Sequence, residues 1–266
     1  MGDYITIKHS YNAGDLIVLM AGLKQLHKIH GKKVVIYQVI DFPAFYYDGA
    51  ISPIKDGSGQ QVCMNMDMFN RLKPLIEHQD FVHSFEVFSG QEIQFDIDKT
   101  RDSRIIPMPA GLLHFYNFAI FPEMSCDLSD PWISVPGISV KQPKYIINRT
   151  SRYTNAYINY YFLKSIQDKF MFLGTQDECD DFNQRFDLNI PILKLDNFLQ
   201  LAIRMTEFSG GIYNQSFLFH LADAMKLPRI IELCGQFPNT FPIGANGHGF
   251  YHQGALEYYT KKMITK

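Results

Sequence analysis

Two short polar segments contain the side chains best placed to do chemistry, and each lies between a strand-like run and an apolar, helix-like run. They are residues 9–15 and residues 214–216. A helix start presents unpaired backbone N–H groups and the positive end of the helix dipole, which suits a phosphate or pyrophosphate. The sequence therefore predicts a nucleotide-type ligand at the Asn214, Gln215 and Ser216 turn.

The first segment ends in an aspartate that can accept a proton. Asp15 stands at the start of an apolar helix, where a carboxylate could act as a general base or could simply cap the helix. Asn12 and Gly14 belong to the same loop, and glycine there permits a positive φ or a close approach of a ligand to the backbone. We expect Asp15 to face the cleft in which ligands of α/β folds bind.

Four further polar residues lie close to the second segment in the expected fold. Arg149 and Arg152 follow a predicted strand, and they either neutralise a leaving diphosphate or are ordinary solvated surface arginines. Glu232 lies inside an apolar strand, where an unpaired carboxylate would be costly, so a ribose or a base is an expected partner at the strand end. His220, between Phe219 and Leu221, fits either core packing or contact with a ligand.

The apolar periodicity predicts an α/β protein made of two Rossmann-like, doubly wound domains, residues 1–140 and 141–266, that face a cleft. A proline-containing linker is expected at 127–143, and the last helix is left open to pack back on the first domain. The expected strands cover 4–8, 33–39, 81–88, 93–97, 144–148, 170–173, 190–195, 207–211 and 229–234. The expected helices cover 16–29, 66–78, 156–169, 177–186, 197–205 and a segment after Ser216 that ends before Pro228.

Composition excludes several classes of protein. The 266 residues are 46% hydrophobic and 20% charged with a net charge of −2, so neither disorder nor general attraction to nucleic acid is expected. No apolar run approaches the ~20 residues of a membrane span. The four cysteines form no CxxC pair, so reduced thiols and a cytoplasmic location are expected.

Motifs of other enzyme classes are absent from the sequence. There is no G-x-S-x-G elbow, no G-K-[ST] loop and no G-x-G-x-x-G, which disfavours hydrolases, kinases and dehydrogenases. Asp96 and Asp98 form a D-x-D triplet, which in A-type glycosyltransferases binds a divalent ion. The flanking pattern does not support that alternative, and we expect neither a metal nor a cofactor.

Three segments resemble, in the same order, the signatures of the lipopolysaccharide heptosyltransferase family. Residues 14–24 are similar to its glycine-aspartate pair followed by an apolar helix. Residues 171–178 are similar to its "hydrophobic-G-x-x-x-E" segment, and residues 211–228 to its D-[ST]-G-x-x-H-x-A-A-x-x-x-P pattern. The resemblance implies a B-type glycosyltransferase fold and sugar transfer from a nucleotide donor without a required metal. It also implies that residues 1–140, with Asn12 and Gly14 in their first loop, form the acceptor side and that residues 141–266 bind the nucleotide-sugar.

The resemblance also implies roles for individual residues. Asp15 matches the residue taken as the catalytic base, and residues 214–216 match the turn whose amides bind the donor phosphates. His220 matches a histidine on the following helix, and Glu178 the acidic residue after the glycine; alternatively, Glu178 belongs to a solvated acidic face. Asn214 replaces the family's usual aspartate and Ser216 its glycine, which puts sugar-hydroxyl recognition and close backbone approach in question.

These observations favour a metal-independent, inverting glycosyltransferase that moves a sugar from a nucleotide-sugar to an acceptor hydroxyl. The substitutions at Asn214 and Ser216 leave open a nucleotide-binding or nucleotide-sugar-binding protein without catalysis. Transfer to a nucleic-acid acceptor is a third hypothesis, which rests on lysines near the first helix: Lys24, Lys28, Lys32 and Lys33.

Overall fold

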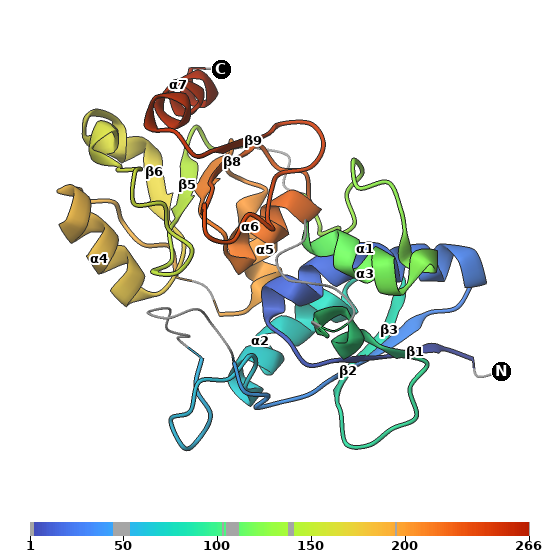
Figure 1. Ribbon diagram of the computed structural model, residues 1–266. Coiled ribbons are helices and arrows are strands. Elements are labelled where there is room, and N and C mark those ends of the chain that lie inside the picture. The colour runs from blue at the N-terminus through green and yellow to red at the C-terminus, as the bar shows by residue number, and fades with distance from the viewer. Residues whose placement is uncertain are drawn as a thin grey trace. The chain divides into compact units, whose positions relative to one another are not determined.

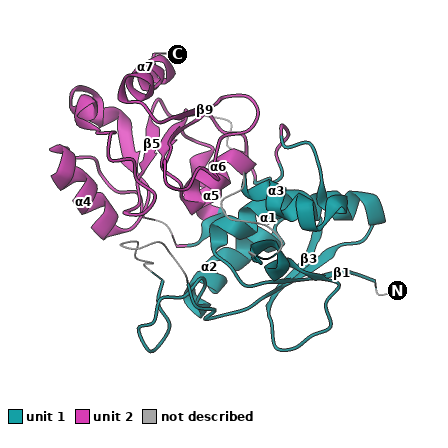
Figure 2. Ribbon diagram, in the orientation of Figure 1, with its two compact units in different colours: residues 1–128, 132–135, 197–199 teal, residues 129–131, 136–196, 200–266 magenta. Residues whose placement is uncertain are grey.

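The computed structural model describes residues 3–44, 54–102, 104, 112–137, 141–194 and 196–265. The chain divides into two compact units (Figure 2). Unit 1 comprises Met1–Leu128, Trp132–Val135 and Asn197–Leu199, and unit 2 comprises Ser129–Pro131, Pro136–Asp196 and Gln200–Lys266. Each unit contains its own parallel sheet with helices beside it, so the predicted α/β class with two parallel sheets is confirmed. The cleft between two domains stays a prediction.

Unit 1 is built on a four-stranded parallel sheet in the order β3-β2-β1-β4 (Figure 1). Its strands are β1 (Ile5–His9), β2 (Val34–Gln38), β3 (Val82–Val87) and β4 (Phe95–Asp96). All four lie within or next to the strands that the sequence predicts. The branched apolar side chains of β1 and β2 are buried in the core of the unit, as expected for a parallel sheet covered on both faces.

The first helix, α1 (Ala13–His30), begins three residues earlier than predicted. Its apolar residues are almost all buried, and Gly31 ends it with φ 66° and an N–H that donates to the carbonyl of His27. The early start places Asp15 inside the first turn of the helix, where a carboxylate interacts favourably with the helix dipole. Unit 1 also contains α2 (Met66–Glu77), the 3₁₀ segments η1 (Ile97–Arg101) and η2 (Pro122–Met124), and α3 (Leu113–Ile120), which the sequence did not predict.

Unit 2 is built on a five-stranded parallel sheet in the order β6-β5-β7-β8-β9. Its strands are β5 (Tyr145–Asn148), β6 (Phe170–Phe172), β7 (Gly211–Tyr213), β8 (Arg229–Glu232) and β9 (Gly247–Phe250). The strand predicted over 207–211 was wrong in position, because β7 begins at the last residue of that segment. The predicted strand at 190–195 is a single parallel bridge between Phe172 and Ile192, with residue 195 outside the described residues.

The helices of unit 2 are α4 (Gln176–Phe186), α5 (Phe198–Met205), α6 (Phe217–Ala224) and α7 (Gln253–Ile264). The predicted helix at 156–169 was wrong for its first five residues, and the remainder is the 3₁₀ helix η3 (Tyr161–Lys169). The backbone N–H groups there bond to distant or local side chains: that of Asn155 to Glu232, and that of Asn159 to Gln253. These bonds hold the backbone at the start of the predicted helix to other parts of unit 2.

The sequence left open how the residues of the expected linker are buried and where the last helix packs. The expected linker contains buried residues, because Trp132 is only 4% exposed and its Nε1 donates to the carbonyl of Ile17 at 2.8 Å. Helix α7 packs against β8 and β9, and its Leu256 belongs to the core of unit 2.

The four cysteines are described and are free thiols. Within the described part of the chain, none of the helices combines the length and apolarity needed to cross a bilayer.

Candidate active site

Each sheet has one point at which the order of its strands reverses. In unit 1 the chain leaves β1 toward β2 and β3 and later returns to add β4 on the other side of β1. In unit 2 it adds β6 on one side of β5, and then β7, β8 and β9 on the other. Ligands of open α/β sheets bind beyond the carboxyl ends of the strands at such a point, because the connections there leave in opposite directions. The two predicted segments follow β1 and β7, which border these two switch points.

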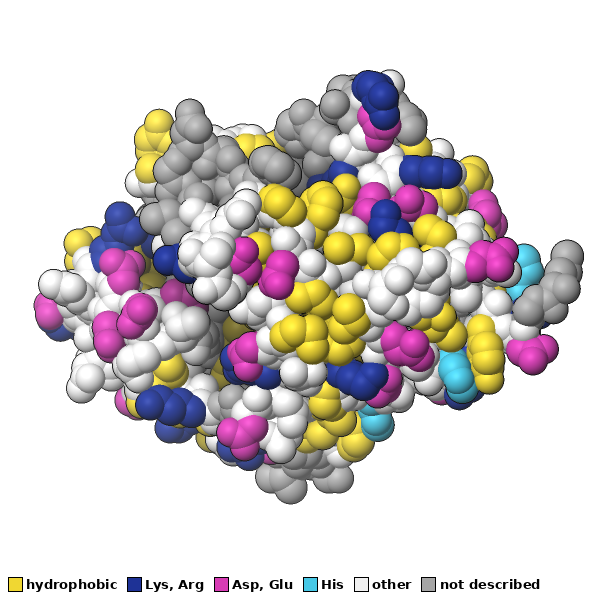
Figure 3. Space-filling view, turned by 90° about the horizontal axis from the view of Figure 1, so that it is seen from below, with side chains coloured by type: hydrophobic (Ala, Val, Ile, Leu, Met, Phe, Trp, Pro, Cys, Tyr) yellow, Lys and Arg dark blue, Asp and Glu magenta, His cyan; other side chains and the backbone are white. Residues whose placement is uncertain are grey.

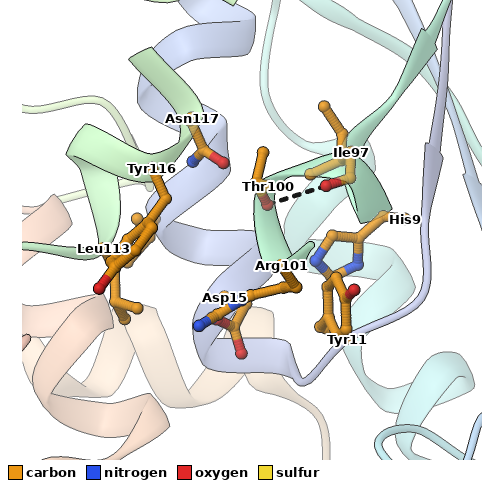
Figure 4. Close-up of a pocket in the computed structure, with 10 residues that line it drawn as sticks. His9, Tyr11, Asp15, Ile97, Thr100, Arg101, Leu113, Tyr116 and Asn117 are labelled. Carbon is orange, nitrogen blue, oxygen red and sulfur yellow. Dashed lines mark hydrogen bonds and ion pairs between the residues drawn. The ribbon is translucent and has the colours of Figure 1, made fainter. Parts of the chain in front are cut away.

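A pocket lies at the switch point of unit 1, beyond the ends of β1 and β4 (Figure 4). Its lining comes from β1, α1, η1 and α3: His9, Tyr11, Asp15, Val18, Ile97, Thr100, Arg101, Leu113, Tyr116 and Asn117. The predicted base is therefore part of a pocket rather than of an open helix end.

Asp15 forms an ion pair with Arg101 inside this pocket. The side chain of Asp15 is 18% exposed and that of Arg101 is 22% exposed, so both charges retain access to solvent. The guanidinium of Arg101 also lies 5.4 Å from the ring centroid of Tyr11 and 5.9 Å from that of Tyr116. An opposite charge at contact favours the ionised carboxylate, which is the form that a general base needs.

Arg101 is a site residue that the sequence analysis missed. It stands far from Asp15 along the chain, at the end of η1, and no local motif marks it. Thr100 fixes the turn before it by donating from Oγ1 to the carbonyl of Ile97 at 2.8 Å. Only the pairing of β4 with β1 brings this turn to the start of α1.

The loop residues before Asp15 begin the helix. Asn12 is the N-cap residue of α1. Its backbone carbonyl accepts from the N–H of Leu16 at 3.1 Å, and its side chain makes no capping hydrogen bond. Gly14 lies in the first helical turn and does not have a positive φ, and the alternative, a close approach of a ligand to its backbone, stays a prediction. Asp15 is the third residue of the helix and not its cap, and its carboxylate forms the ion pair with Arg101.

At the switch point of unit 2, Asn214 ties the loop after β5 to the loop after β7. Its side chain is fully buried. Its Nδ2 donates to the carbonyl of Thr150 at 3.1 Å and to that of Arg152 at 2.7 Å, while its Oδ1 accepts from the N–H of Thr150 at 3.1 Å. The structure thus gives the Asn214 side chain a role in shaping the loop that carries Arg152.

Gln215 and Ser216 are likewise engaged by the protein. Gln215 accepts from the N–H of Cys234 at 3.0 Å and donates to the carbonyl of Phe237 at 2.9 Å, which fixes the segment after β8. Ser216 is the N-cap of α6: its hydroxyl accepts from the N–H of Phe219 at 3.2 Å and donates to Asn148 at 2.7 Å. The groups at this turn that suit an anion are therefore the backbone N–H groups of the helix start.

Arg149 and Glu232, two predicted donor contacts, bind each other in the core of unit 2. Arg149 donates from Nε and Nη2 to the two oxygens of Glu232, at 2.8 and 3.0 Å. The hydroxyl of Tyr160 and the N–H of Asn155 also donate to this carboxylate. The charge of Glu232 raises the pKa of Arg149 above its ordinary value, against the opposing effect of burial. Both side chains are buried, so Arg149 is not a solvated surface arginine.

The remaining predicted residues differ in exposure. Arg152 is half-buried at the switch point, directly after the loop that Asn214 fixes. Glu178 forms a capping box with Thr175 at the start of α4, since its carboxylate accepts from the N–H of Thr175 at 3.0 Å. His220 is half-buried on α6, and its ring lies edge-on to Phe219 at 5.6 Å.

The D-x-D triplet is bound to a lysine. Lys8 contacts Asp98 at 2.8 Å and Asp96 at 3.4 Å. These carboxylates raise the pKa of Lys8, although burial acts in the opposite direction. In the ranges that the structure describes, no group of three or more His, Cys, Asp or Glu side chains is placed to hold a metal ion.

Charge on the visible surface is mixed. Figure 3 shows Lys and Arg side chains interspersed with Asp and Glu over one face of the molecule. Lys24 and Lys28 are exposed and lie one turn apart on α1. Lys33, which follows the helix, is also exposed. Nucleic-acid binding needs a continuous basic stripe, and the face in Figure 3 does not present one among its described residues.

No family model and no curated protein matches the sequence. A solved glycosyltransferase of family 9 from Veillonella parvula has a similar structure, with a TM-score of 0.51 and 12% identity over 97% of this chain and 91% of that one. The chain shares the fold of this glycosyltransferase. The likeness supports, at the level of fold, the glycosyltransferase resemblance that the sequence motifs indicate.

Two other solved structures align more loosely with the chain. The E. coli heptosyltransferase WaaC with ADP has a TM-score of 0.47 and 11% identity, over 99% of this chain and 100% of that one. The iron-containing dodecameric glycosyltransferase TibC from enterotoxigenic E. coli H10407 has a TM-score of 0.46 and 13% identity, over 92% of this chain and 61% of that one.

Proposed function

We propose that this protein is a metal-independent, inverting glycosyltransferase that moves a sugar from a nucleotide-sugar donor to an acceptor hydroxyl. The observation that carries the proposal is the position of Asp15: a partly exposed carboxylate in a pocket at the switch point of a sheet, in a chain with a glycosyltransferase fold.

In the proposed reaction, Asp15 takes the proton of the acceptor hydroxyl as the acceptor oxygen attacks the anomeric carbon of the donor. The bond from that carbon to the diphosphate oxygen breaks, and the nucleoside diphosphate leaves with the electron pair. A single displacement with one base and no carboxylate nucleophile inverts the anomeric carbon. The cleft expected from the sequence belongs to this proposal, because donor and acceptor must meet.

The donor diphosphate is assigned to the helix start of α6, where backbone N–H groups and the helix dipole favour an anion. Arg152 is the proposed charge partner, since Asn214 fixes the backbone at that residue. Arg149 is not retained for this role because its guanidinium is bound to Glu232.

The test is turnover by Asp15→Asn, measured as release of nucleoside diphosphate from a panel of nucleotide-sugars with added acceptors, with and without EDTA. General-base catalysis typically contributes ~10²- to 10⁴-fold, and a loss of that size is expected while nucleotide affinity stays within a few-fold. Asp67→Asn is the matched control, because Asp67 lies in the first turn of α2 and is exposed.

Unchanged turnover in Asp15→Asn would refute the assignment of the base. Nucleotide binding by the wild-type chain without transfer to any acceptor would instead support a binding protein that lacks catalysis. This second candidate rests on the hydrogen bonds that the side chains of Asn214 and Ser216 make within the protein.

A further inference from the structure

Asn246 and Gly247 form a reactive pair at the start of the outermost strand of unit 2. Asn246 is exposed and lies in a turn with φ 62°, a left-handed conformation that asparagine tolerates better than most residues. Gly247 is the first residue of β9, which ends the order of strands in this sheet (Figure 1). Glycine has no side chain, so its backbone nitrogen can approach the side-chain amide of a preceding asparagine closely, and asparagine amides are chemically labile.

The buried Arg229 explains why glycine follows this asparagine. Arg229 is the first residue of β8, and its guanidinium donates to the carbonyls of Ile243 and Ala245 in the turn before β9. A Cβ on residue 247 would lie 2.9 Å from Cζ of Arg229 and 2.7 Å from Cβ of Pro242, closer than Cβ atoms approach other atoms in proteins. A side chain at Gly247 would displace this buried charge, so the fold itself retains the glycine.

The backbone N–H of Gly247 is oriented away from the neighbouring strand. The carbonyl of Asn246 accepts from the N–H of Arg229 at 2.9 Å, so this carbonyl points toward β8. In a planar trans peptide the N–H of the next residue points in the opposite direction. On that side the sheet has no further strand among the residues that the structure describes. The nitrogen of Gly247 therefore takes no part in the ladder between β8 and β9.

We propose that Asn246 is a site of spontaneous deamidation, with hydroxide and water as the co-reactants. Hydroxide takes the proton of the Gly247 nitrogen, which attacks Cγ of Asn246. A bond forms between these two atoms, the bond from Cγ to the amide nitrogen breaks, and ammonia leaves with a proton taken from water. Water then opens the cyclic succinimide at Cγ, which gives aspartate, or at the main-chain carbonyl, which gives isoaspartate. Nothing is oxidised or reduced.

Isoaspartate at residue 246 is expected to loosen the edge of the sheet. The main chain then runs through Cγ and is longer by a methylene group. The former main-chain carbonyl, which accepted from Arg229, becomes part of a free carboxylate. Helix α7 packs against β8 and β9, so it loses part of its support when β9 is displaced.

Asp56 and Gly57 provide an internal contrast. The carboxylate of Asp56 accepts from the N–H groups of Ser58 and Gln60, both at 2.9 Å, and from the hydroxyl of Ser58 at 2.8 Å. The bond from the Ser58 hydroxyl and the backbone bonds lower the pKa of Asp56, so its carboxyl group is ionised near neutral pH. An ionised carboxylate is a poor target for a nucleophile, and no isoaspartate is expected there.

The first test incubates the intact chain at physiological temperature over a series of neutral to mildly alkaline pH values. Mass spectrometry then follows the tryptic peptide 230–261, and a sample digested without incubation corrects for reaction during digestion. Asn246 is expected to exchange its amino group for a hydroxyl, faster at higher pH, while Asn239 in the same peptide stays intact because Thr240 obstructs the approach. Reaction at Asn246 no faster than at Asn239 would overturn the inference.

The second test uses Asn246→Gly, the matched variant, since glycine adopts a positive φ and has no amide to lose. It should abolish the mass gain at residue 246 and any isoaspartate there, whereas Asp56 should form none in either protein. Hydrogen exchange then compares the two proteins after the same incubation. The wild-type chain is expected to exchange faster at residues 247–250 and 253–264, in proportion to its isoaspartate content. Equal exchange in spite of isoaspartate would contradict the loosening of β9, and neither test depends on the proposed function.

Discussion

Asn214 stands where the similar family has an aspartate, and its contacts explain the amide. Its Nδ2 points at the carbonyl oxygens of Thr150 and Arg152, which only a donor can satisfy. A carboxylate oxygen in that position would face two acceptors in a fully buried place. The departure from the family pattern is therefore a change in how the loop after β5 is held.

For this reason Asn214→Asp is expected to lower the free energy of unfolding by about 3 kcal/mol, through two lost hydrogen bonds and a buried charge. Urea denaturation of the two proteins measures the difference. Asn189→Asp, at an exposed position of the same unit, serves as the control and should change little. Equal stability of Asn214→Asp and the wild-type chain would show that the amide is not needed.

His9 makes stability depend on pH in a defined direction. Its folded-state pKa is about 4 and the ordinary value is 6.5, so the unfolded chain binds more protons between these values. Stability is therefore lost as the pH falls from about 6.5 toward 4, by on the order of 3 kcal/mol in all. His9→Gln should reduce this slope in denaturant titrations at a series of pH values, and His78→Gln should not.

At the scale of elements, the paired ends of strands carry most of the polar chemistry. Arg149 follows β5 and Glu232 ends β8, and their bidentate bond spans the intervening strand β7. The guanidinium lies 5.6 Å from the ring centroid of Tyr160 and 5.5 Å from that of Phe186. A charge pair so enclosed fixes the geometry of the strand ends that border the proposed donor site.

Breaking this pair is expected to be costly. Glu232→Gln leaves Arg149 charged and buried without a counter-charge, which typically lowers the free energy of unfolding by about 3–5 kcal/mol. Glu178→Gln, in the capping box of α4, is the matched control and should cost about 1 kcal/mol or less. Denaturant midpoints compare the two, and a cost for Glu232→Gln no greater than the control would contradict the structural role.

At the scale of the whole molecule, the chain assigns its two candidate sites to different sheets. The proposed base, Asp15, lies at the switch point of unit 1, and the helix start of α6 lies at that of unit 2. A nucleoside diphosphate should therefore bind through unit 2 without using Asp15.

Hydrogen exchange of the intact protein with uridine, adenosine, guanosine and cytidine diphosphates, in EDTA, tests this division. One of them is expected to slow exchange at residues 148–153 and 214–218 and to leave residues 9–15 unchanged. At a hundred times its dissociation constant it should add about 2.7 kcal/mol of stability. Protection confined to unit 1, or none with any nucleotide, would contradict the donor assignment.

Much of the fold was predictable because its signals are local. Apolar runs, Gly31 and the alternation of strands with helices predicted most strands, α1 and the parallel sheets without any tertiary information. The exception at residues 155–159 has a tertiary cause, because the backbone N–H groups of Asn155 and Asn159 bond to the side chains of Glu232 and Gln253, which are distant in the sequence.

The sequence by itself determined the two polar segments and their order, because a turn between a strand and a helix is a property of neighbouring residues. Only the tertiary structure decided which partners those residues meet. Arg101 reaches Asp15, and Gln38 orients His9, through strand pairings that no local pattern encodes. The tertiary structure also paired Arg149 with Glu232, because a buried charge needs a counter-charge and the fold supplies one from a distant part of the sequence.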